Sequence, residues 1–246
     1  MQRRLTVVEG MALAQDIAQN WQQIWNFQAR KGDVLLDTYP KSGMEEVNAM
    51  PSPRILKSHL PVHLVPPSFW RHDCKVIYVA RNARDTVTSY YHFDQMLQFH
   101  PDPNPWENYL ERFMKGEVGW GSWYDHVKGF WEMKEKHQIL YIFFEDLKKT
   151  PLQQIQKVAH FLGKNLPEET LSQIARLSTF DHMKNNPMAN NSDFPKEILN
   201  QSKSGFMRKG KVGDWKTMFT VQQNEIFEDD YRRQMEDSSL TFHNPK

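Results

Sequence analysis

Three separate segments of the chain carry side chains that could bind a phosphate-type anion. The first is the stretch 39–43, YPKSG, which follows a short apolar run. A glycine-containing turn at the end of a strand lets backbone N–H groups converge on an anion, with the Lys41 ammonium beside them. It is not a Walker A loop, because the G-x-x-x-x-G-K-[ST] spacing is absent. Taken alone, the stretch is a weak signal and favours a surface turn over an anion site.

The other two segments lie further along the chain. Arg81 directly follows the apolar run 75–80, and Ser89 comes two helical turns later. An arginine at the carboxyl end of a parallel strand faces the crevice where open α/β sheets bind ligands, although a structural pair with Asp85 is equally consistent. The stretch 206–211, FMRKGK, is a basic loop that could be a solvated flap or could close over a polyanion.

The composition limits the classes of partner. Lys plus Arg total 31 against 30 Asp plus Glu in 246 residues, a net charge of +1, which argues against nucleic acid or an anionic membrane surface. Cys74 is the single cysteine, so we expect a reducing compartment, no disulfide framework and no multi-cysteine metal site. No run approaches the roughly twenty apolar residues of a membrane span. We therefore expect a cytoplasmic protein.

The elements that would position these segments alternate along the chain. Strands are predicted at 34–36, 54–57, 75–80 and 139–144, and helices at 11–27, 83–98 after an Asn82 cap, 122–136, 152–162, 168–177 and 221–235. Residues 185–213 are polar and aperiodic, which predicts a long loop that orders on binding. Alternating strands and helices indicate an α/β fold, a single domain over 1–246 with a mostly parallel central sheet flanked by helices.

Five short motifs occur in a fixed order: 39–43 (YPKSG), 57–61 (KSHLP), 78–82 (YVARN), 89–93 (SYYHF) and 206–210 (FMRKG). From about Asn26 onward the chain resembles the cytosolic sulfotransferases, most closely the phenol-sulfotransferase branch. The resemblance implies one sulfotransferase domain with a sheet related to that of the P-loop kinases. It also implies 3′-phosphoadenosine 5′-phosphosulfate (PAPS) as sulfuryl donor, no metal, and a small phenolic acceptor.

The resemblance also assigns roles. His59 matches the catalytic base, which suits an imidazole because a phenol of pKa near 10 must lose its proton as it attacks. Lys41 matches the contact to the bridging oxygen of the donor, and Lys57, two residues before His59 on an extended segment, projects to the same side. Ser89 completes the catalytic set. The implied cofactor-binding residues are Lys41, Ser42, Gly43, Arg81, Ser89, Phe144, Ser178, Phe180, Phe206, Met207, Arg208, Lys209 and Gly210, and the implied substrate-binding residues are Lys57, His59, Phe93 and His100.

Some of these positions leave alternatives open. Phe144 stands where relatives commonly have tyrosine, so we expect a modest loss of donor affinity. Phe93 and His100 could equally belong to the core. Near the C-terminus the chain fits the short dimerisation motif of the family, Lys-x-x-x-Thr-Val-x-x-x-Glu, and its oppositely charged ends could pair head to tail in a homodimer. Its residues are Lys216, Thr220, Val221 and Glu225, and Thr220 could instead simply cap a helix.

The chain departs from the family pattern directly after Gly43. Relatives continue with Thr-Thr-Trp, a long helix and a strand, whereas here Met44 to Met50 lead at once to Pro51. At most two helical turns fit, and Glu45 and Glu46 would repel a bound phosphosulfate. We thus expect a fold that lacks one helix and strand region. An active sulfotransferase competes with an impaired shortened form that acts as a non-catalytic dimerisation or nucleotide-binding protein; a nucleotide kinase is disfavoured by the absent Walker A pattern.

Overall fold

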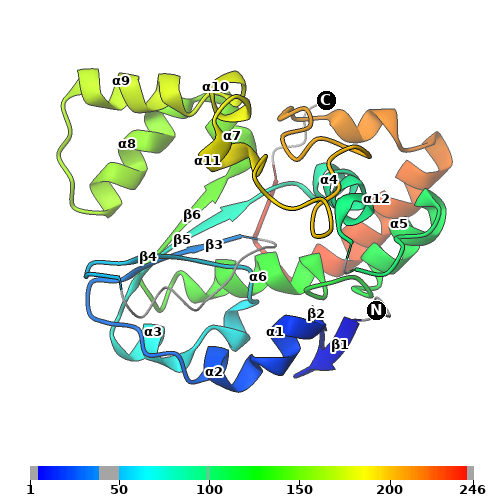
Figure 1. The fold of residues 1–246 in the computed structure, drawn as a ribbon, viewed down its shortest axis with the longest axis horizontal. Coiled ribbons are helices and arrows are strands. Elements are labelled where there is room, and N and C mark those ends of the chain that lie inside the picture. The colour runs from blue at the N-terminus through cyan, green and yellow to red at the C-terminus, as the bar shows by residue number, and fades with distance from the viewer. Residues whose placement is uncertain (1–4, 39–49, 99, 243–246) are drawn as a thin grey trace.

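The computed structural model describes residues 5–38, 50–98 and 100–242 (Figure 1). The predictions for Lys41, Ser42 and Gly43, and for the short segment with Glu45 and Glu46, lie outside the described residues.

A four-stranded parallel sheet forms the centre of the molecule. Its strands are β3 (Val34–Asp37), β4 (Ile55–Ser58), β5 (Lys75–Ala80) and β6 (Ile139–Phe143), arranged in the order β4-β3-β5-β6. Asp37 is in register with Ser58 and with Tyr78, and Ala80 with Phe143, so the carboxyl ends of all four strands share one edge. The predicted α/β fold with a parallel sheet is confirmed. The shared edge brings together the segments that follow each strand.

Helices surround this sheet (Figure 1). The structure contains α1 (Gln15–Gln19), α2 (Trp21–Trp25), α3 (Pro67–Arg71), α4 (Ala83–Met96), α5 (Trp106–Met114), α6 (Trp123–Met133), α7 (Phe144–Lys149), α8 (Pro151–Phe161), α9 (Glu168–Leu177), α10 (Phe180–Lys184), α11 (Pro187–Asn190) and α12 (Val221–Met235), with 3-10 turns η2 (Val62–Leu64) and η3 (Asp214–Thr217). The side chain of Asn82 accepts a hydrogen bond from the Asp85 N–H at the start of α4, as the sequence predicts.

The prediction of one helix over 11–27 is wrong. Met11–Ala14 forms strand β2, which pairs antiparallel with β1 (Leu5–Val8), and only α1 and α2 follow as short helices. The turn of this hairpin, Glu9 and Gly10, takes positive φ angles of 49° and 79°. Interstrand hydrogen bonds and the burial of Leu13 outweigh the helical spacing of the apolar residues.

The sequence prediction lacks five helices of the structure, α3, α5, α7, α10 and α11; α5 is the longest of them, and its signal is present. In α5 the buried side chains Trp106, Tyr109, Leu110 and Phe113 recur at helical spacing. The segment 185–213 is mostly irregular, as expected, but it contains α11 and is anchored by a bridge between Leu97 and the buried Leu199. Within the described ranges, no helix has both the length and the apolar character needed to cross a membrane.

Candidate active site

A cavity of about 300 Å³ opens at the carboxyl edge of the sheet. It is lined from β4 and its end, from the end of β5, from α4, from the start of α7 and from the segment 204–208. Eight of the residues predicted for the site line this one cavity: Lys57, His59, Arg81, Ser89, Phe93, Phe144, Phe206 and Arg208. The fold therefore collects an imidazole, three cations, a hydroxyl and three aromatic rings from distant parts of the sequence.

His59 directly follows β4 and is 2% exposed. Its Nδ1 lies in close hydrogen-bonding contact with the backbone carbonyl of Thr38, and the Trp120 ring meets the imidazole edge-on at a centroid distance of 5.6 Å. A carbonyl can only accept, so in the neutral ring the proton is on Nδ1 and the lone pair is on Nε2. The ring thus has the tautomer that a general base needs.

A buried polar cluster beneath His59 holds its backbone. His126 Nε2 donates to the His59 carbonyl oxygen at 3.1 Å, and Tyr78 Oη donates to His126 Nδ1 at 2.8 Å. Asp37 Oδ1 lies 3.8 Å from the same His126 Nε2. Burial lowers the pKa of His126 to about 4, and burial raises the pKa of Asp37 well above its usual value. His126 is therefore neutral at pH 7, as its two hydrogen bonds require.

Lys57 reaches the cavity beside His59. The two residues are separated by one position on an extended segment, so they project to the same side, as the sequence predicts. Surrounding protein atoms lower the pKa of the Lys57 ammonium by desolvation, although solvent still reaches the side chain through the open cavity. A cation in partly desolvated surroundings interacts more strongly with a nearby anion than one in bulk water.

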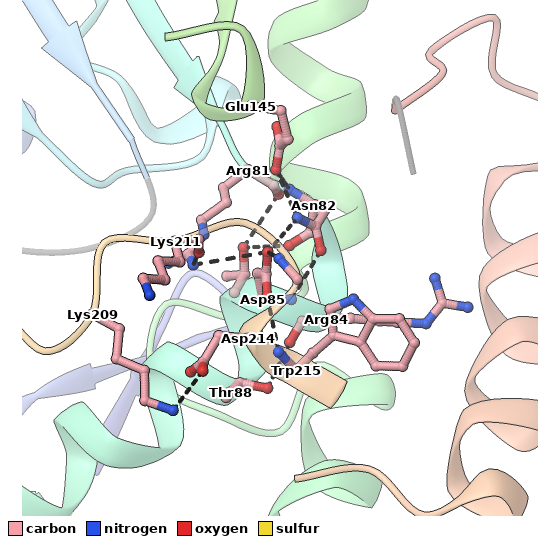
Figure 2. A network of polar contacts seen from close by, with 12 residues as sticks. Arg81, Asn82, Arg84, Asp85, Thr88, Glu145, Lys209, Lys211, Asp214 and Trp215 are labelled. Atoms are coloured by element: carbon pink, nitrogen blue, oxygen red, sulfur yellow. Dashed lines mark hydrogen bonds and ion pairs between the residues drawn. The ribbon is translucent and has the colours of Figure 1, made fainter. Parts of the chain in front are cut away.

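Arg81 extends from the end of β5 toward the basic loop (Figure 2). Its Nη2 donates to the Lys211 carbonyl oxygen at 3.0 Å, and the same atom is 3.9 Å from Asp85 Oδ2. The guanidinium carbon lies 4.6 Å from the centroid of the Phe144 ring. The structural pair with Asp85 is thus present at long distance, while Arg81 still lines the cavity.

The basic loop supplies the opposite wall. Arg208 makes a close ion pair with Asp214, and Lys209 Nζ lies 2.6 Å from Asp214 Oδ1. Burial by itself raises the pKa of Asp214, but hydrogen bonds from Lys209 and Arg208 bring its net pKa below the usual value. The Asp214 carboxylate is therefore ionised and keeps both cations in place.

Six predicted residues of the described chain do not line this cavity: Ser178, Phe180, Lys209, Gly210, Met207 and His100. Phe180, Lys209 and Gly210 line a neighbouring cleft of about 770 Å³ with Lys148 and Lys211. Gly210 has a φ of 59°, and a Cβ there would lie 2.1 Å from the Phe180 ring, so glycine is needed at that position. Ser178 ends α9, where its hydroxyl donates to the Ile174 carbonyl oxygen at 2.7 Å.

The remaining two of these residues are Met207 and His100. Met207 lies between Phe206 and Arg208 and is half-buried. His100 is placed in the core, 5% exposed, with Nδ1 3.0 Å from Asp94 Oδ1. Tyr109 Oη donates to the other oxygen of Asp94 at 2.8 Å. The core alternative for His100 is therefore the one that the structure favours over a place on the cavity wall.

An apolar cavity of about 260 Å³ lies on the other side of His59 and Lys57, both of which line it. Its remaining walls are mostly aliphatic and aromatic and come from α1, α2, α3 and β3; they include Ile17, Ile24, Phe27, Leu35, Phe69 and Trp120. The imidazole is thus shared between a cationic cavity and an apolar one. Among the described residues, no group of three or more His, Cys, Asp or Glu side chains is placed to hold a metal ion.

Sequence reasoning missed several residues that shape the site. Trp120 and His126 contact His59, and Tyr78 contacts His126. Of these three, only Tyr78 belongs to a recognised motif, 78–82, and that motif gave it no role at the site. His126 lies on α6, where one inward-facing histidine on an apolar face reads as core. Tyr78 lies inside β5 and reads as a buried strand residue. No signal in the sequence separates them from ordinary core residues.

A parallel α/β sheet whose carboxyl edge joins clustered cations to a buried imidazole is suited to an enzyme that transfers a group from an anionic donor. The Sulfotransferase domain family matches residues 7–239. Human Sulfotransferase 1C2 is 47% identical over 283 positions, covering 98% of this chain and 96% of that protein. Sulfotransferase 1 family member D1 of Mus musculus is also 47% identical, with the same coverage of 98% and 96%. The chain belongs to the sulfotransferase family of enzymes.

Solved structures agree with this assignment. The crystal structure of mouse sulfotransferase SULT7A1 complexed with PAP has a TM-score of 0.84 at 29% identity, and the match covers 96% of each chain. A retinol dehydratase in complex with retinol and PAP has a TM-score of 0.85 at 22% identity, which supports the fold alone. The alignment with human Sulfotransferase 1C2 spans 283 positions whereas this chain has 246 residues. That relative therefore contains residues without a counterpart here.

Proposed function

We propose that this chain transfers a sulfuryl group from PAPS to the hydroxyl of a small phenolic or aromatic acceptor, by in-line displacement with His59 as general base. The observation that carries the proposal is the convergence of His59, Lys57, Arg81, Ser89 and Arg208 on one cavity. The donor is supported by the mouse relative solved with PAP, the nucleotide product of such a transfer. The single domain over 1–246 and a cytoplasmic location remain predictions.

The residues of the cavity fit the proposed donor. Arg81 and Arg208 offer guanidinium donors, and Ser89 offers a hydroxyl, to a phosphate group between them. Phe144 and Phe206 offer flat apolar faces to a nucleobase or ribose. Bound there, PAPS would supply an activated sulfuryl group. Lys41, Ser42 and Gly43 are proposed to hold its 5′ end, and Phe180, Ser178, Met207, Lys209 and Gly210 its adenosine end.

The proposed chemistry at His59 follows from its tautomer. The Nε2 lone pair takes the proton of the acceptor hydroxyl while its oxygen bonds to sulfur, and the electrons of the breaking S–O bond pass to the departing phosphate oxygen. Lys57 stabilises the negative charge on the transferring oxygens. The apolar cavity behind His59 supports a flat, uncharged acceptor, because burying a charged group there without partners would be costly.

The test is transfer from labelled PAPS to a simple phenol by the purified chain. We expect transfer by the unmodified chain and a loss of about 10²–10⁴-fold in kcat for His59→Ala, the range that a general base contributes. His160→Ala, which removes an exposed histidine of α8, is the matched control and should keep full activity. Full activity in His59→Ala would contradict the proposed base, and no transfer by the folded chain would contradict the proposed activity.

The second candidate, a non-catalytic dimerisation or nucleotide-binding protein, is favoured by a specific observation. The proposed dimerisation residues Lys216, Thr220, Val221 and Glu225 are all exposed, and Val221 is 78% exposed at the start of α12. An apolar side chain so exposed between two opposite charges is suited to a two-fold contact.

Light scattering tests the dimer. We expect the mass of a dimer at micromolar concentration for the unmodified chain and that of a monomer for Val221→Glu, because a like charge is then buried twice in a two-fold contact. Gln222→Glu adds the same charge at the neighbouring exposed position and should remain dimeric. A monomer in all three proteins would remove this candidate, and a dimer that binds nucleotide without transfer would favour it over the enzyme.

A further inference from the structure

Asp85 is a fully buried carboxylate in the first turn of α4, and its two oxygens accept hydrogen bonds from a distant segment (Figure 2). Oδ2 accepts from the Gly213 N–H at 2.7 Å, and Oδ1 accepts from the Trp215 N–H at 3.0 Å. Asn82 Nδ2 donates a third hydrogen bond to Oδ2 at 2.9 Å. A carboxylate with no solvent contact is therefore stabilised mainly by backbone donors 128 and 130 positions along the chain.

The tethered segment directly follows the cationic loop. Asp214 lies between the two tethered N–H groups, and its carboxylate holds Arg208 and Lys209. Just before the tether, the Lys211 carbonyl accepts from Arg81 Nη2 at 3.0 Å. The path from Arg208 to Trp215 is thus fixed through Asp85 and Arg81, which lie one helical turn apart at the end of β5 and the start of α4.

The other side of Asp85 is itself rigidly held. Asn82 donates to Glu145 Oε1 through its backbone N–H at 2.9 Å and through Nδ2 at 2.6 Å, which joins the start of α4 to α7. The Arg84 guanidinium carbon lies 5.0 Å from the Trp215 ring, and Arg84 Nε donates to Asn224 of α12 at 2.9 Å. The carboxylate is therefore a fixed point against which the cationic loop is placed.

We propose that Asp85 is a positioning residue for donor binding: its carboxylate fixes the segment 213–215 so that Arg208 faces Arg81 across the cavity. This inference rests on the proposed donor. Two oxygens serve two N–H groups, so an amide at this position could accept from only one of them and would turn its own NH₂ toward the other. The loop would then be ordered only after the nucleotide binds, which weakens binding.

The closing experiment compares the unmodified chain with Asp85→Asn by calorimetric titration with 3′,5′-diphosphoadenosine. We expect the dissociation constant to rise about 10–150-fold in Asp85→Asn, the effect of losing one charge-assisted hydrogen bond in a buried site. The KM for PAPS should rise by the same factor, while kcat at saturating donor and the KM for the phenol change less than about threefold. If Asp85 only stabilised the fold, the dissociation constant, both KM values and kcat would change together or not at all.

Asp230→Asn is the matched control. Asp230 of α12 is another buried carboxylate, 8% exposed, and it accepts a hydrogen bond from Tyr124 Oη at 3.0 Å. This variant should keep the dissociation constant of the unmodified chain. Asp85→Glu, which retains the charge and displaces both oxygens by one methylene, should give an intermediate value and replaces Asp85→Asn if that variant does not fold.

The outcomes separate the two proposals. No binding by the unmodified chain would reject the proposed donor and this inference with it. Binding by the unmodified chain with an unchanged dissociation constant in folded Asp85→Asn or Asp85→Glu would reject this inference alone. Hydrogen exchange gives an independent readout, because the amides of Gly213 and Trp215 should exchange faster in Asp85→Asn than in Asp230→Asn even without nucleotide.

Discussion

At the scale of single residues, the site brings neutral and charged groups together on one cavity. The His59 carbonyl oxygen accepts a hydrogen bond from His126; both histidines are buried, and burial keeps His126 neutral at pH 7 by lowering its pKa to about 4. Arg81 and Arg208 carry positive charge on other parts of the cavity wall and are paired with Asp85 and Asp214, while Lys57 lies beside His59. The proposed base therefore shares the cavity with three cations, and nearby positive charge disfavours the protonated form of an imidazole.

The pKa of His126 leads to a prediction about stability and pH. Its pKa is about 4 in the folded protein and about 6.5 in an unfolded chain, so the unfolded state binds the proton first as the pH falls. The contribution of neutral His126 to stability is therefore complete above pH 6.5 and is lost between pH 6.5 and 4. We expect this loss to be about 3 kcal/mol in total.

Urea unfolding at several pH values between 7.5 and 4.5 measures this effect. His126→Asn removes the titrating group and is expected to be less stable at pH 7.5, because the hydrogen bonds to Tyr78 and His59 are altered. It should lose less stability than the unmodified chain on acidification, so the two curves converge. Burial raises the pKa of Asp37, but Asp37 is present in both proteins, so the difference between the two curves reports on His126. Parallel curves would contradict a neutral buried His126.

At the scale of elements, the ends of helices and strands do most of the positioning. The ends of β4 and β5 place His59 and Arg81, and the first two turns of α4 place Asp85 and Ser89.

The start of α12 is stabilised by its own side chains. Thr220 accepts from the Gln223 N–H at 3.1 Å, and Gln223 Oε1 accepts from the Thr220 N–H at 3.0 Å, which is a capping box. The capping alternative for Thr220 is therefore present in the monomer, whatever its role in a dimer.

Thr220→Ala tests that cap. We expect the free energy of unfolding to fall by about 1 kcal/mol, because the Gln223 N–H loses its partner. Thr220→Ser keeps the hydroxyl and should restore most of the stability. Both are measured by urea unfolding at fixed protein concentration. The same loss of stability when Thr220→Ala is introduced into the monomeric Val221→Glu variant would show that the effect comes from the cap and not from the dimer contact. No loss of stability in either the dimeric or the monomeric protein would contradict the capping box.

At the scale of the whole molecule, ligand binding should be visible as increased stability. A ligand that binds only the folded state at 100 times its dissociation constant stabilises it by about 2.7 kcal/mol. For a chain of this size that corresponds to a rise in Tm of about 5–10 °C. We expect this shift with 3′,5′-diphosphoadenosine and a smaller one with adenosine 5′-monophosphate, which lacks the 3′-phosphate.

The assignment of the 3′-phosphate to Arg81 is tested in the same thermal-shift measurement. Arg81→Gln should reduce the shift with 3′,5′-diphosphoadenosine to about that with adenosine 5′-monophosphate, because a neutral amide cannot replace the charge-assisted contact. Arg176→Gln, an exposed position on α9, should leave the shift unchanged. Equal shifts for the two nucleotides with the unmodified chain would contradict a 3′-phosphate site.

The sequence by itself determined the class of fold, and it predicted eight residues that line one cavity of the structure. The continuous apolar run of β5 predicts a covered parallel strand, and its position directly before Arg81 predicts an anion site at the edge of the sheet. The fold inference succeeds because hydrophobic runs and caps are properties of neighbouring residues, whereas the anion site stays a prediction. The order of five short motifs is likewise readable without a structure.

Only the tertiary structure decided what surrounds those residues. The tether from Asp85 to Gly213 and Trp215, the support of His59 by His126, and the place of His100 in the core each join segments whose meeting depends on how the elements pack. The hairpin at the start of the chain is a further case, since pairing with β1 overrides the helical spacing of β2. Local sequence patterns cannot predict these contacts, because the free energy that stabilises the contacts comes from burial and hydrogen bonds between distant segments.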